Sequence, residues 1–224
     1  MQILPVAKIY TPFPAKFGVP RQSGLVPTES RLVFEPAYRS PDAVRGIEGF
    51  SHLWLIWEFT EARREGNPLT VRPPRLGGNE RVGVFASRSP FRPNSLGLSC
   101  VKLLHVDLDA PDAPVLYLEG ADLTNGTPVY DVKPYLPFTD SVPHAVGGFA
   151  AEKAGLSLNV RYAADTAGMP AETLAALTAV LAQDPRPHYQ NDPERIYAFE
   201  FSGWHVAFRC EDGTVTVTAL EKEK

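Results

Sequence analysis

The 224-residue chain contains few residues suited to disulfides or to metal binding. Its two cysteines, Cys100 and Cys210, lie in separate apolar, strand-like runs, which favours buried thiols over a disulfide and fits a reducing compartment. The five histidines show no paired spacing, and neither cysteine has a nearby ligand partner, so we expect no metal site. We also find no secretory signal pattern and no apolar run long enough to span a bilayer, so we expect a cytoplasmic protein without membrane contacts.

Standard catalytic and nucleotide-binding motifs are missing as well. The sequence has no nucleophile elbow and no phosphate-binding loop with its lysine. The pair Gly77-Gly78 is not followed by a helical pattern, which argues against a dinucleotide fingerprint there. Generic motifs alone therefore identify no class of enzyme.

Arginine, in contrast, is concentrated in one stretch. Residues 72–97 contain five arginines, a single acid and no lysine, for a net charge of +4 in a chain whose overall charge is −4. Four prolines and four glycines in the same stretch place these arginines on turns and strand ends, not along a helix. The cluster indicates a site for phosphate, carboxylate or nucleic acid, although folding would equally allow the arginines to lie on different faces. The five are Arg72, Arg75, Arg81, Arg88 and Arg92.

Short strand-like runs dominate residues 1–137. Proline, with 22 residues, has about twice its usual share, which suits short strands joined by fixed turns. Because little room remains for crossover helices, the pattern favours an antiparallel barrel or sandwich over a doubly wound sheet. A short helix is predicted for Pro41–Gly49, with Ser40 as its N-cap. The predicted strands are Gln2–Ile9, Arg31–Phe34, His52–Phe59, Arg81–Ala86, Leu98–Asp107, Val115–Leu118 and Val129–Val132.

The character of the chain changes after residue 137. Asp140–Gly155 is rich in glycine and alanine and indicates a linker. We then predict a strand at Leu156–Tyr162 and a helix at Pro170–Gln183, where alanine and leucine recur at helical spacing. A three-strand meander follows, with strands Arg195–Phe201, Trp204–Cys210 and Thr214–Leu220. The expected domains are a larger β-rich domain at 1–138, a linker at 139–155 and a small α+β domain at 156–224.

Four polar clusters lie in apolar surroundings and are bounded by prolines. Because proline fixes the backbone, the prolines of each cluster pre-organise the side chains that lie between them. Ordinary turn chemistry would explain any single cluster as well, since Asp, Asn and Pro are common in turns. The clusters are residues 17–22, 86–94, 122–137 and 183–187.

Taken together, the clusters point to a known family. The chain resembles the TrmO (YaeB-type) tRNA methyltransferase family from about Ile9 to Pro187, and the terminal meander also fits. The resemblance is specific because several long motifs recur in order, and only residues 140–155 show nothing diagnostic. The motifs are PRQ (20–22), DAVRGIEGFSHLWLI (42–56), VRPPRLGGN (71–79), GVFASRSPFRPN (83–94), DLTNGTPVYDVKPYLP (122–137) and QDPRP (183–187).

This resemblance implies an S-adenosylmethionine-dependent enzyme whose cofactor is held by the loops of a β-barrel, not by a Rossmann sheet. The fold class is then mainly β, with an N-terminal antiparallel barrel and a small C-terminal α+β domain. The implied substrate is tRNA carrying N6-threonylcarbamoyladenosine at position 37 of the anticodon loop, and the product is its N6-methyl derivative. The family resemblance further implies a homodimer.

The resemblance also assigns a set of cofactor-binding residues. Arg21 and Arg88 would pair with a carboxylate, Asp122 would accept from an amine or a ribose hydroxyl, and Leu98 would form an apolar wall. Thr60 and Glu61 fall at a cofactor-contacting position, where this sequence departs from the His-Gln pair that family members can carry. The full expected set is Pro20, Arg21, Gln22, Thr60, Glu61, Arg88, Leu98, Asp122, Leu123 and Thr124.

Methyl transfer to N6 requires alignment of the nucleophile and removal of the N6 proton. Alternation in a strand places Asp131, Lys133 and Tyr135 on one face, so we predict that Asp131 or Lys133 handles the proton while Tyr135 stacks on or orients the base. The expected RNA-binding residues are Arg72, Arg75, Phe91, Arg92, Asp184 and Arg186.

Two other functions remain open at this point. A non-catalytic RNA-binding barrel would need the arginines and aromatic residues but has no use for Arg21, Gln22 and Asp122 together. A methyltransferase of the same fold, acting on another nucleotide or a small molecule, would keep the cofactor residues and change only the substrate. Cofactor affinity separates the first alternative from an enzyme.

Overall fold

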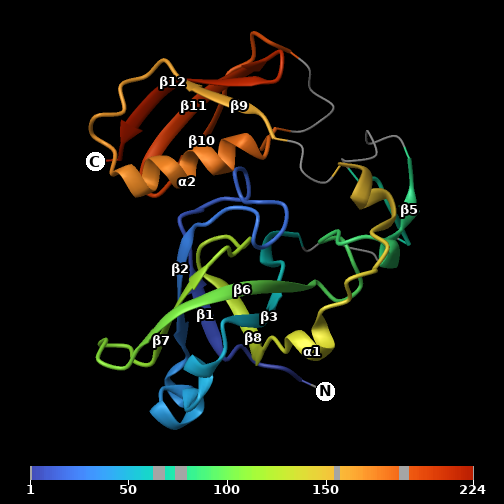
Figure 1. The fold of residues 1–224 in the computed structure, drawn as a ribbon, viewed down its shortest axis with the longest axis vertical. Coiled ribbons are helices and arrows are strands. Elements are labelled where there is room, and N and C mark those ends of the chain that lie inside the picture. The colour runs from blue at the N-terminus through green and yellow to red at the C-terminus, as the bar shows by residue number, and fades with distance from the viewer. Residues whose placement is uncertain (1, 63–68, 74–79, 154–156, 187–191, 224) are drawn as a thin grey trace.

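The computed structural model describes residues 2–62, 69–73, 80–153, 157–186 and 192–223. Six strands form a closed antiparallel barrel in the spatial order β1-β2-β7-β6-β3-β8. The barrel confirms the expected mainly β class, and Figure 1 shows the C-terminal sheet beyond one end of it. The barrel strands are β1 (Ala7–Tyr10), β2 (Glu29–Phe34), β3 (His52–Glu58), β6 (Leu96–Asp107), β7 (Val115–Glu119) and β8 (Thr127–Pro134).

Alternating apolar residues explain why these segments close around one core. In β3, Leu53, Leu55 and Trp57 are buried while the residues between them are partly exposed. A strand with this period of two presents one face to the interior. The barrel core collects such faces from all six strands, with Ile9, Leu32, Leu53, Leu55, Val101, Leu116, Leu118 and Val129 among its buried residues.

The C-terminal part forms a second sheet with one helix. The strand order is β10-β11-β12-β9, in which β9 joins parallel to β12. The predicted meander and helix are confirmed, and the turn at Asp212-Gly213 has both residues at positive φ. Within the described ranges, no helix is long and apolar enough to cross a bilayer. The elements are β9 (Asn159–Tyr162), α2 (Ala171–Ala182), β10 (Tyr197–Phe201), β11 (Trp204–Glu211) and β12 (Thr214–Lys222).

The segment after β1 belongs to the core of the C-terminal sheet, although it is close to the barrel in sequence. Phe13 and Val26 are buried in the same apolar cluster as α2 and β10–β12. Gly18 has a φ of +97°, and a Cβ there would lie 2.5 Å from Cδ2 of Phe199, so only glycine allows this approach. The ring of Phe17 packs beside those of Tyr197 and Phe208. This packing attaches the C-terminal sheet to the barrel, while the expected domain limits at 138 and 155 stay a prediction.

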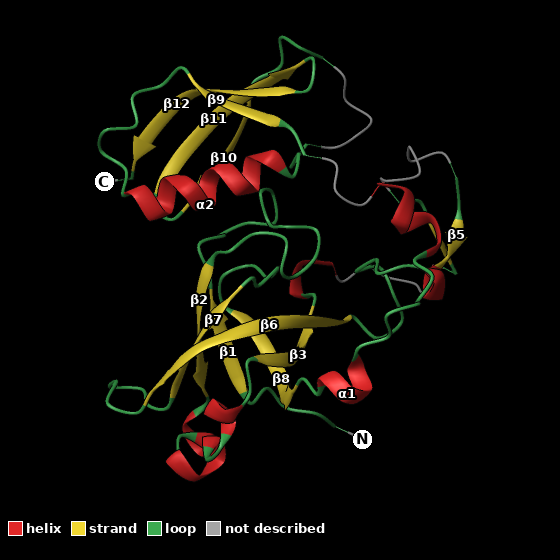
Figure 2. Ribbon diagram, viewed as in Figure 1, coloured by secondary structure: helices red, strands yellow, loops and turns green. Residues whose placement is uncertain are grey.

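Two segments extend to one side of the body, at the right of Figures 1 and 2. The first carries the two-stranded sheet of β4 (Thr70–Val71) and β5 (Val82–Gly83), followed by the 3₁₀ helix η6 (Val84–Ala86). The second carries α1 (Pro137–Asp140) and η7 (Gly148–Lys153), of which η7 lies where the sequence predicted only a linker. These segments bring residues far apart in sequence to the same side of the barrel.

Several predicted elements differ from the structure. The first strand begins at Ala7 instead of residue 2, after Pro5, which has no N–H to donate. The strand predicted for Arg81–Ala86 is wrong beyond Gly83, because its partner β4 is only two residues long. The predicted helix over residues 41–49 is two 3₁₀ turns, η2 (Pro41–Val44) and η3 (Ile47–Gly49), because Gly46 adopts a φ of +87° between them.

The cap predicted for that helix is nevertheless present. The hydroxyl of Ser40 accepts a hydrogen bond from the backbone N–H of Asp42. With η1 (Pro36–Tyr38), these short turns form the lobe at the end of the barrel opposite to the C-terminal sheet (Figure 2). The predicted strand at Leu156–Tyr162 begins at Asn159 in the structure, and Leu156 lies outside the described residues.

Candidate active site

A cavity of about 1880 Å³ opens where the barrel, the two side segments and the C-terminal part meet. Its wall combines the loop after β1, the end of β3 with the 3₁₀ helix η4 (Thr60–Ala62), the arginine-rich stretch and the start of β6. The largest contributions come from residues 16–22, 57–61, 70–73, 85–94 and 96–98, with smaller ones from Arg81, Asp122, Thr124, Thr127, Gly147, Phe149, Ala150, Pro185 and Arg186.

This cavity gathers nearly all of the cofactor-binding residues expected from the sequence. Leu123 is the exception, because its side chain is buried in the barrel core and its carbonyl oxygen accepts from the hydroxyl of Thr11 at 2.9 Å. The nine that line the cavity are Pro20, Arg21, Gln22, Thr60, Glu61, Arg88, Leu98, Asp122 and Thr124.

Asp122 is a partly buried carboxylate in the cavity wall. Its Oδ1 accepts a hydrogen bond from the hydroxyl of Ser99 in β6, and that hydroxyl in turn accepts one from Nε1 of Trp57 at 2.9 Å. Burial raises the pKa of Asp122, while the Ser99 hydroxyl and the positive charge of Arg88 act in the opposite direction. A desolvated carboxylate fixed in this way is a strong acceptor for a ligand hydroxyl or ammonium group.

Gln22 connects two arginines of the cavity wall. Its side-chain oxygen accepts a hydrogen bond from Nη1 of Arg88, and its Nε2 donates to the backbone carbonyl of Arg21 at 2.5 Å. The guanidinium of Arg21 turns toward the C-terminal part and donates through Nη2 to the carbonyl oxygens of Asp184 and Arg186, at 2.9 and 3.2 Å. Arg88 is thus held by a side chain of the cavity wall, whereas Arg21 binds protein backbone.

The expected RNA-binding residues separate into three groups. Arg72, Phe91 and Arg92 line the cavity, and Nζ of Lys16 lies 5.6 Å from the ring centroid of Phe91. Asp184 and Arg186 pair with each other through two hydrogen bonds, and only Arg186 lines the cavity. Arg75 lies outside the described residues.

The expected catalytic residues lie elsewhere, on the outer face of the barrel beside α1. Nζ of Lys133 is 2.9 Å from Oδ2 of Asp131, and Lys133 is the cross-strand neighbour of Trp54. Tyr135 follows the last residue of β8, and its ring centroid is 5.7 Å from that of Trp54. The structure brings the three residues together on one face, as expected, but none of them is among the residues that line the cavity.

Asp140 of α1 completes this outer cluster. Its Oδ2 accepts from the backbone N–H of Leu136 and from Nε1 of Trp54, both at 2.9 Å. These two donors lower the pKa of the Asp140 carboxyl. The carboxylate therefore fixes the indole of Trp54 beside the ring of Tyr135.

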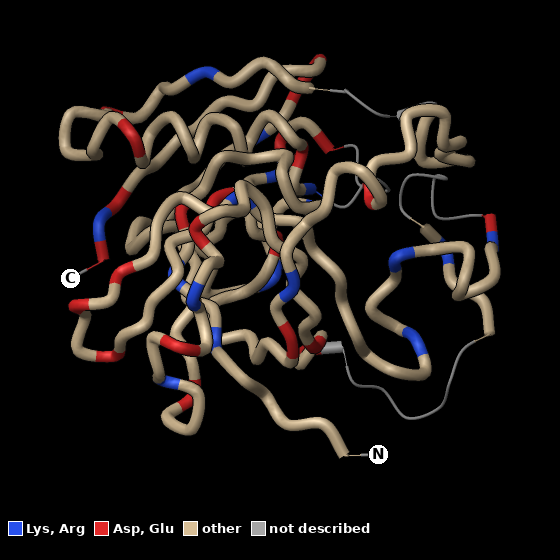
Figure 3. Tube along the Cα trace, turned by 60° about the horizontal axis from the view of Figure 1, so that its bottom comes forward, with Lys and Arg blue, Asp and Glu red and all other residues tan. Residues whose placement is uncertain are grey.

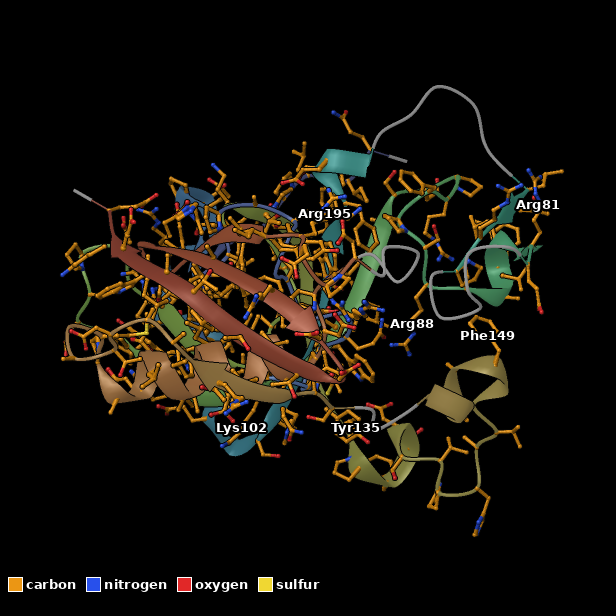
Figure 4. All side chains as sticks on the ribbon, turned by 90° about the horizontal axis from the view of Figure 1, so that it is seen from above. Arg81, Arg88, Lys102, Tyr135, Phe149 and Arg195 are labelled. Carbon is orange, nitrogen blue, oxygen red and sulfur yellow. The ribbon has the colours of Figure 1, made fainter. Side chains whose placement is uncertain are left out.

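Several residues of the cavity wall were missed by the sequence analysis. Phe85 is 78% exposed and faces the cavity, and Phe149 enters it from η7, inside the stretch predicted to be a linker. Arg88 and Phe149 lie toward the same opening, with Arg81 at the outer edge of the side segment (Figure 4). No local motif marks a lone phenylalanine in a glycine-rich stretch, so only the fold reveals Phe149.

The charge of the wall is strongly unbalanced. Seven of its lining residues are basic and three are acidic, although the whole chain has a net charge of −4. Figure 3 shows basic positions along the side segment that carries β5. Among the residues that the structure describes, no group of three or more His, Cys, Asp or Glu side chains could hold a metal ion. The basic residues are Lys16, Arg21, Arg72, Arg81, Arg88, Arg92 and Arg186, and the acidic ones are Glu58, Glu61 and Asp122.

Comparison with known families covers both parts of the chain. A family model described as the tRNA-methyltransferase O N-terminal domain matches residues 8–141. A second model, described as the TrmO C-terminal domain, matches residues 157–223.

Individual proteins give the same result. The chain is 42% identical over 227 residues to a tRNA (adenine(37)-N6)-methyltransferase of Escherichia coli strain K12, covering 96% of each chain. It is 40% identical over 204 residues to a putative S-adenosylmethionine-dependent methyltransferase, RcsF, of Pseudomonas aeruginosa, covering 87% of this chain and 86% of the relative. A crystal structure of TrmO from P. aeruginosa superposes with a TM-score of 0.78 and 30% identity, covering 99% of this chain and 97% of the other.

Proposed function

Because the chain belongs to the TrmO family of tRNA methyltransferases, we propose that it transfers the methyl group of S-adenosylmethionine to N6 of adenosine 37 in tRNA. The observation that carries this proposal is the cavity, which combines nine of the ten expected cofactor-binding residues, two of them arginines, with five further basic side chains. A cofactor-binding wall and an RNA-binding wall then belong to one site. Such continuity is what transfer from a small cofactor to a large anionic substrate requires.

The residues of the cavity fit S-adenosylmethionine chemically. Asp122 offers a partly buried carboxylate for a ribose hydroxyl or the amino group, and Arg88 offers a guanidinium for the carboxylate of the cofactor. Leu98 is 55% exposed and provides an apolar surface for the adenine. Pockets for small ligands usually measure about 300–1000 Å³, so the cavity is large enough for the cofactor.

When bound, S-adenosylmethionine supplies an electrophilic methyl group. The chain itself must hold the adenine so that N6 faces that methyl group, and it must accept the N6 proton as the new N–C bond forms. We propose Asp131, paired with Lys133, as the proton acceptor, with Tyr135 orienting the base. Since these residues lie on the outer face of the barrel, this assignment requires the adenine to reach that face beside α1.

The substrate is proposed in finer detail as tRNA whose adenosine 37 already carries the N6-threonylcarbamoyl group. This modification adds a carboxylate to the base, and the arginines of the cavity are suited to bind one. Base stacking on Phe85 and Phe91 suits an anticodon loop, whose unpaired bases are available to aromatic side chains.

A homodimer is the proposed assembly. Its support in this chain is the apolar surface of the second side segment, where Phe138 is 86% and Val146 is 94% exposed. Single exposed apolar residues are common, but two on one projecting segment suit an interface. Light scattering after size-exclusion chromatography should give twice the mass of the chain, and a monomer at all concentrations would contradict the assembly.

The function is tested by incubating the protein with S-adenosylmethionine that carries a deuterated methyl group and with defined tRNAs. Three substrates separate the levels of the proposal: tRNA with the threonylcarbamoyl group, an unmodified transcript, and a transcript with guanosine at position 37. Mass spectrometry of the digested nucleosides should find the label only in the first. Label in the unmodified transcript would refute the finer substrate, and no label in any tRNA would refute the methyltransferase.

A further inference from the structure

A continuous chain of hydrogen bonds crosses the cavity wall and links three parts of the sequence. Arg88 donates to the side-chain oxygen of Gln22, and Gln22 donates to the backbone carbonyl of Arg21. Arg21 then donates to the carbonyl oxygens of Asp184 and Arg186. The stretch before β6, the loop after β1 and the turn after α2 are therefore connected on the side that faces the ligand.

The turn at residues 184–186 has an unusual backbone that needs support. Asp184 adopts a φ of +50°, although it is not glycine. Its carboxylate accepts from Nε and Nη2 of Arg186 at 2.8 and 3.0 Å, and the two side chains are only 16% and 13% exposed. This bidentate pair shapes the turn from within and engages two of the five N–H donors of Arg186.

Arg21 supports the same turn from the barrel side. Both carbonyl oxygens that it binds belong to a half-buried turn outside any helix or strand, where a backbone acceptor requires a partner. A charged donor makes these hydrogen bonds stronger than neutral ones. Pro185 and Arg186 line the cavity, so the position of the turn determines the shape of that wall.

Apolar packing around the loop explains how one arginine can have this effect. Gly18 and Phe17 lie against Phe199 and the neighbouring rings of the C-terminal sheet, which anchors the loop a few residues before Arg21. Arg21 adds the polar contact where this packing ends at the cavity. Its hydrogen bonds therefore hold the C-terminal turn in a fixed place relative to Gln22 and Arg88.

We infer that Arg21 is a positioning residue that holds turn 184–186 as a wall of the cofactor cavity, and that it does not bind the cofactor carboxylate. The inference rests on the proposed function, because it concerns the same cavity. It also changes the interpretation of the C-terminal part, whose turn becomes a structural component of the cofactor site. Asp184 and Arg186 then act by shaping this turn, not by contacting RNA phosphates.

Ligand binding separates the two roles of Arg21. S-adenosylhomocysteine has the carboxylate, whereas 5′-methylthioadenosine lacks the whole amino-acid portion. Isothermal titration should show that Arg21→Ala reduces the affinity for both ligands by a similar factor, about tenfold, because both contact the cavity wall that the turn at residues 184–186 forms. If Arg21 bound the carboxylate, Arg21→Ala would lose affinity for S-adenosylhomocysteine alone, and that result would overturn the inference. Affinities unchanged for both ligands would overturn it as well.

Hydrogen exchange of the backbone amides tests the turn without any ligand. In Arg21→Ala, the peptide that contains residues 184–186 should exchange about tenfold faster than in the wild type. Arg209→Ala serves as the control, because Arg209 is exposed on β11 and does not line the cavity. Unchanged exchange of the turn would contradict the inference. If the wild-type protein bound neither ligand, the proposed function would fail while exchange still decided the role of Arg21.

Two further variants keep the test valid if Arg21→Ala folds poorly. Arg21→Gln retains a side-chain N–H donor without charge, so it should restore part of the slow exchange if the acceptors are carbonyl oxygens. Arg186→Ala should reduce the affinity for both ligands equally, and the double variant with Arg21→Ala should bind little more weakly than either single variant. Fully additive losses would show that the two residues act separately and would overturn the shared role.

Discussion

Ser99 donates a hydrogen bond from its hydroxyl to Oδ1 of Asp122, and this contact links the barrel core to the ligand cavity. The same hydroxyl accepts from Nε1 of Trp57, whose ring lies over Gly97 so closely that a Cβ there would be 2.3 Å from Cε2. Strands β3 and β6 thereby fix the direction of a carboxylate that follows β7. The barrel supplies a pre-oriented acceptor in the cavity without a helix N-terminus or a glycine-rich loop.

Asp122→Asn should make the folded protein more stable at neutral pH and should reduce its affinity for the cofactor. Burial raises the pKa of Asp122 in the folded protein, so the stability contributed by its protonated form is present below the unfolded value of 3.8 and is lost as pH rises through the folded value. The neutral amide avoids that loss. Thermal unfolding should show a higher Tm for the variant at pH 7 and no difference below about pH 4. A lower Tm at pH 7 would contradict this account of the carboxylate.

Neutralising arginines of the cavity should flatten the salt dependence of tRNA binding. Arg72 and Arg92 line the wall that is proposed to face RNA. Each phosphate contact removed should lower the slope of log K against log salt by about 0.7–1. Filter binding at several salt concentrations measures the slope for Arg72→Ala and Arg92→Ala. The control is Arg45→Ala, since Arg45 pairs with Asp42 in the distant lobe. An equal change of the salt slope in this control would contradict the assignment of Arg72 and Arg92 to RNA binding.

Phe85→Ala should weaken tRNA binding without affecting folding. Its ring is 78% exposed on the cavity wall, so its removal costs little apolar burial. Loss of one base-stacking partner costs about 1–3 kcal/mol of binding free energy. Phe50→Ala in the opposite lobe is the matched control. Unchanged affinity for the anticodon stem-loop would show that Phe85 does not stack on RNA.

Asp131→Asn tests the assignment of the proton acceptor. A general base typically contributes about 10²–10⁴-fold to the rate, so single-turnover methyl transfer should slow by at least about a hundredfold while tRNA binding is retained. Lys133→Met should have a smaller effect, because Lys133 acts through its ion pair with Asp131. A normal rate in Asp131→Asn would direct attention to the carboxylates inside the cavity, Glu58 and Asp122.

Local periodicity predicted the regular parts of the fold correctly. The alternation in β3 and the turn at Asp212-Gly213 are confirmed because short-range sterics and burial decide both. The helix predicted from residue 41 was wrong because Gly46 changes the sign of φ after one turn. The strand predicted from Arg81 was wrong because strand length depends on a partner that is distant in sequence.

The site could be predicted only where motifs mark it. The family motifs identified residues 20–22, Arg88 and Asp122, and barrel closure brings them to one cavity. Phe149 was missed because its position depends on a side segment that has no motif. Motifs also suggested a cofactor role for Arg21. Nothing in the local sequence could show that its guanidinium donates to the carbonyl oxygens of residues 184 and 186.

Isothermal titration of S-adenosylmethionine into the wild type and into Asp122→Ala decides whether the cavity binds the cofactor. Asp109→Ala is the control, because Asp109 is exposed and does not line the cavity. We expect one binding site per chain in the wild type and in Asp109→Ala, with affinity reduced at least about tenfold in Asp122→Ala. Equal affinity in all three proteins would place the cofactor outside this cavity and contradict the account.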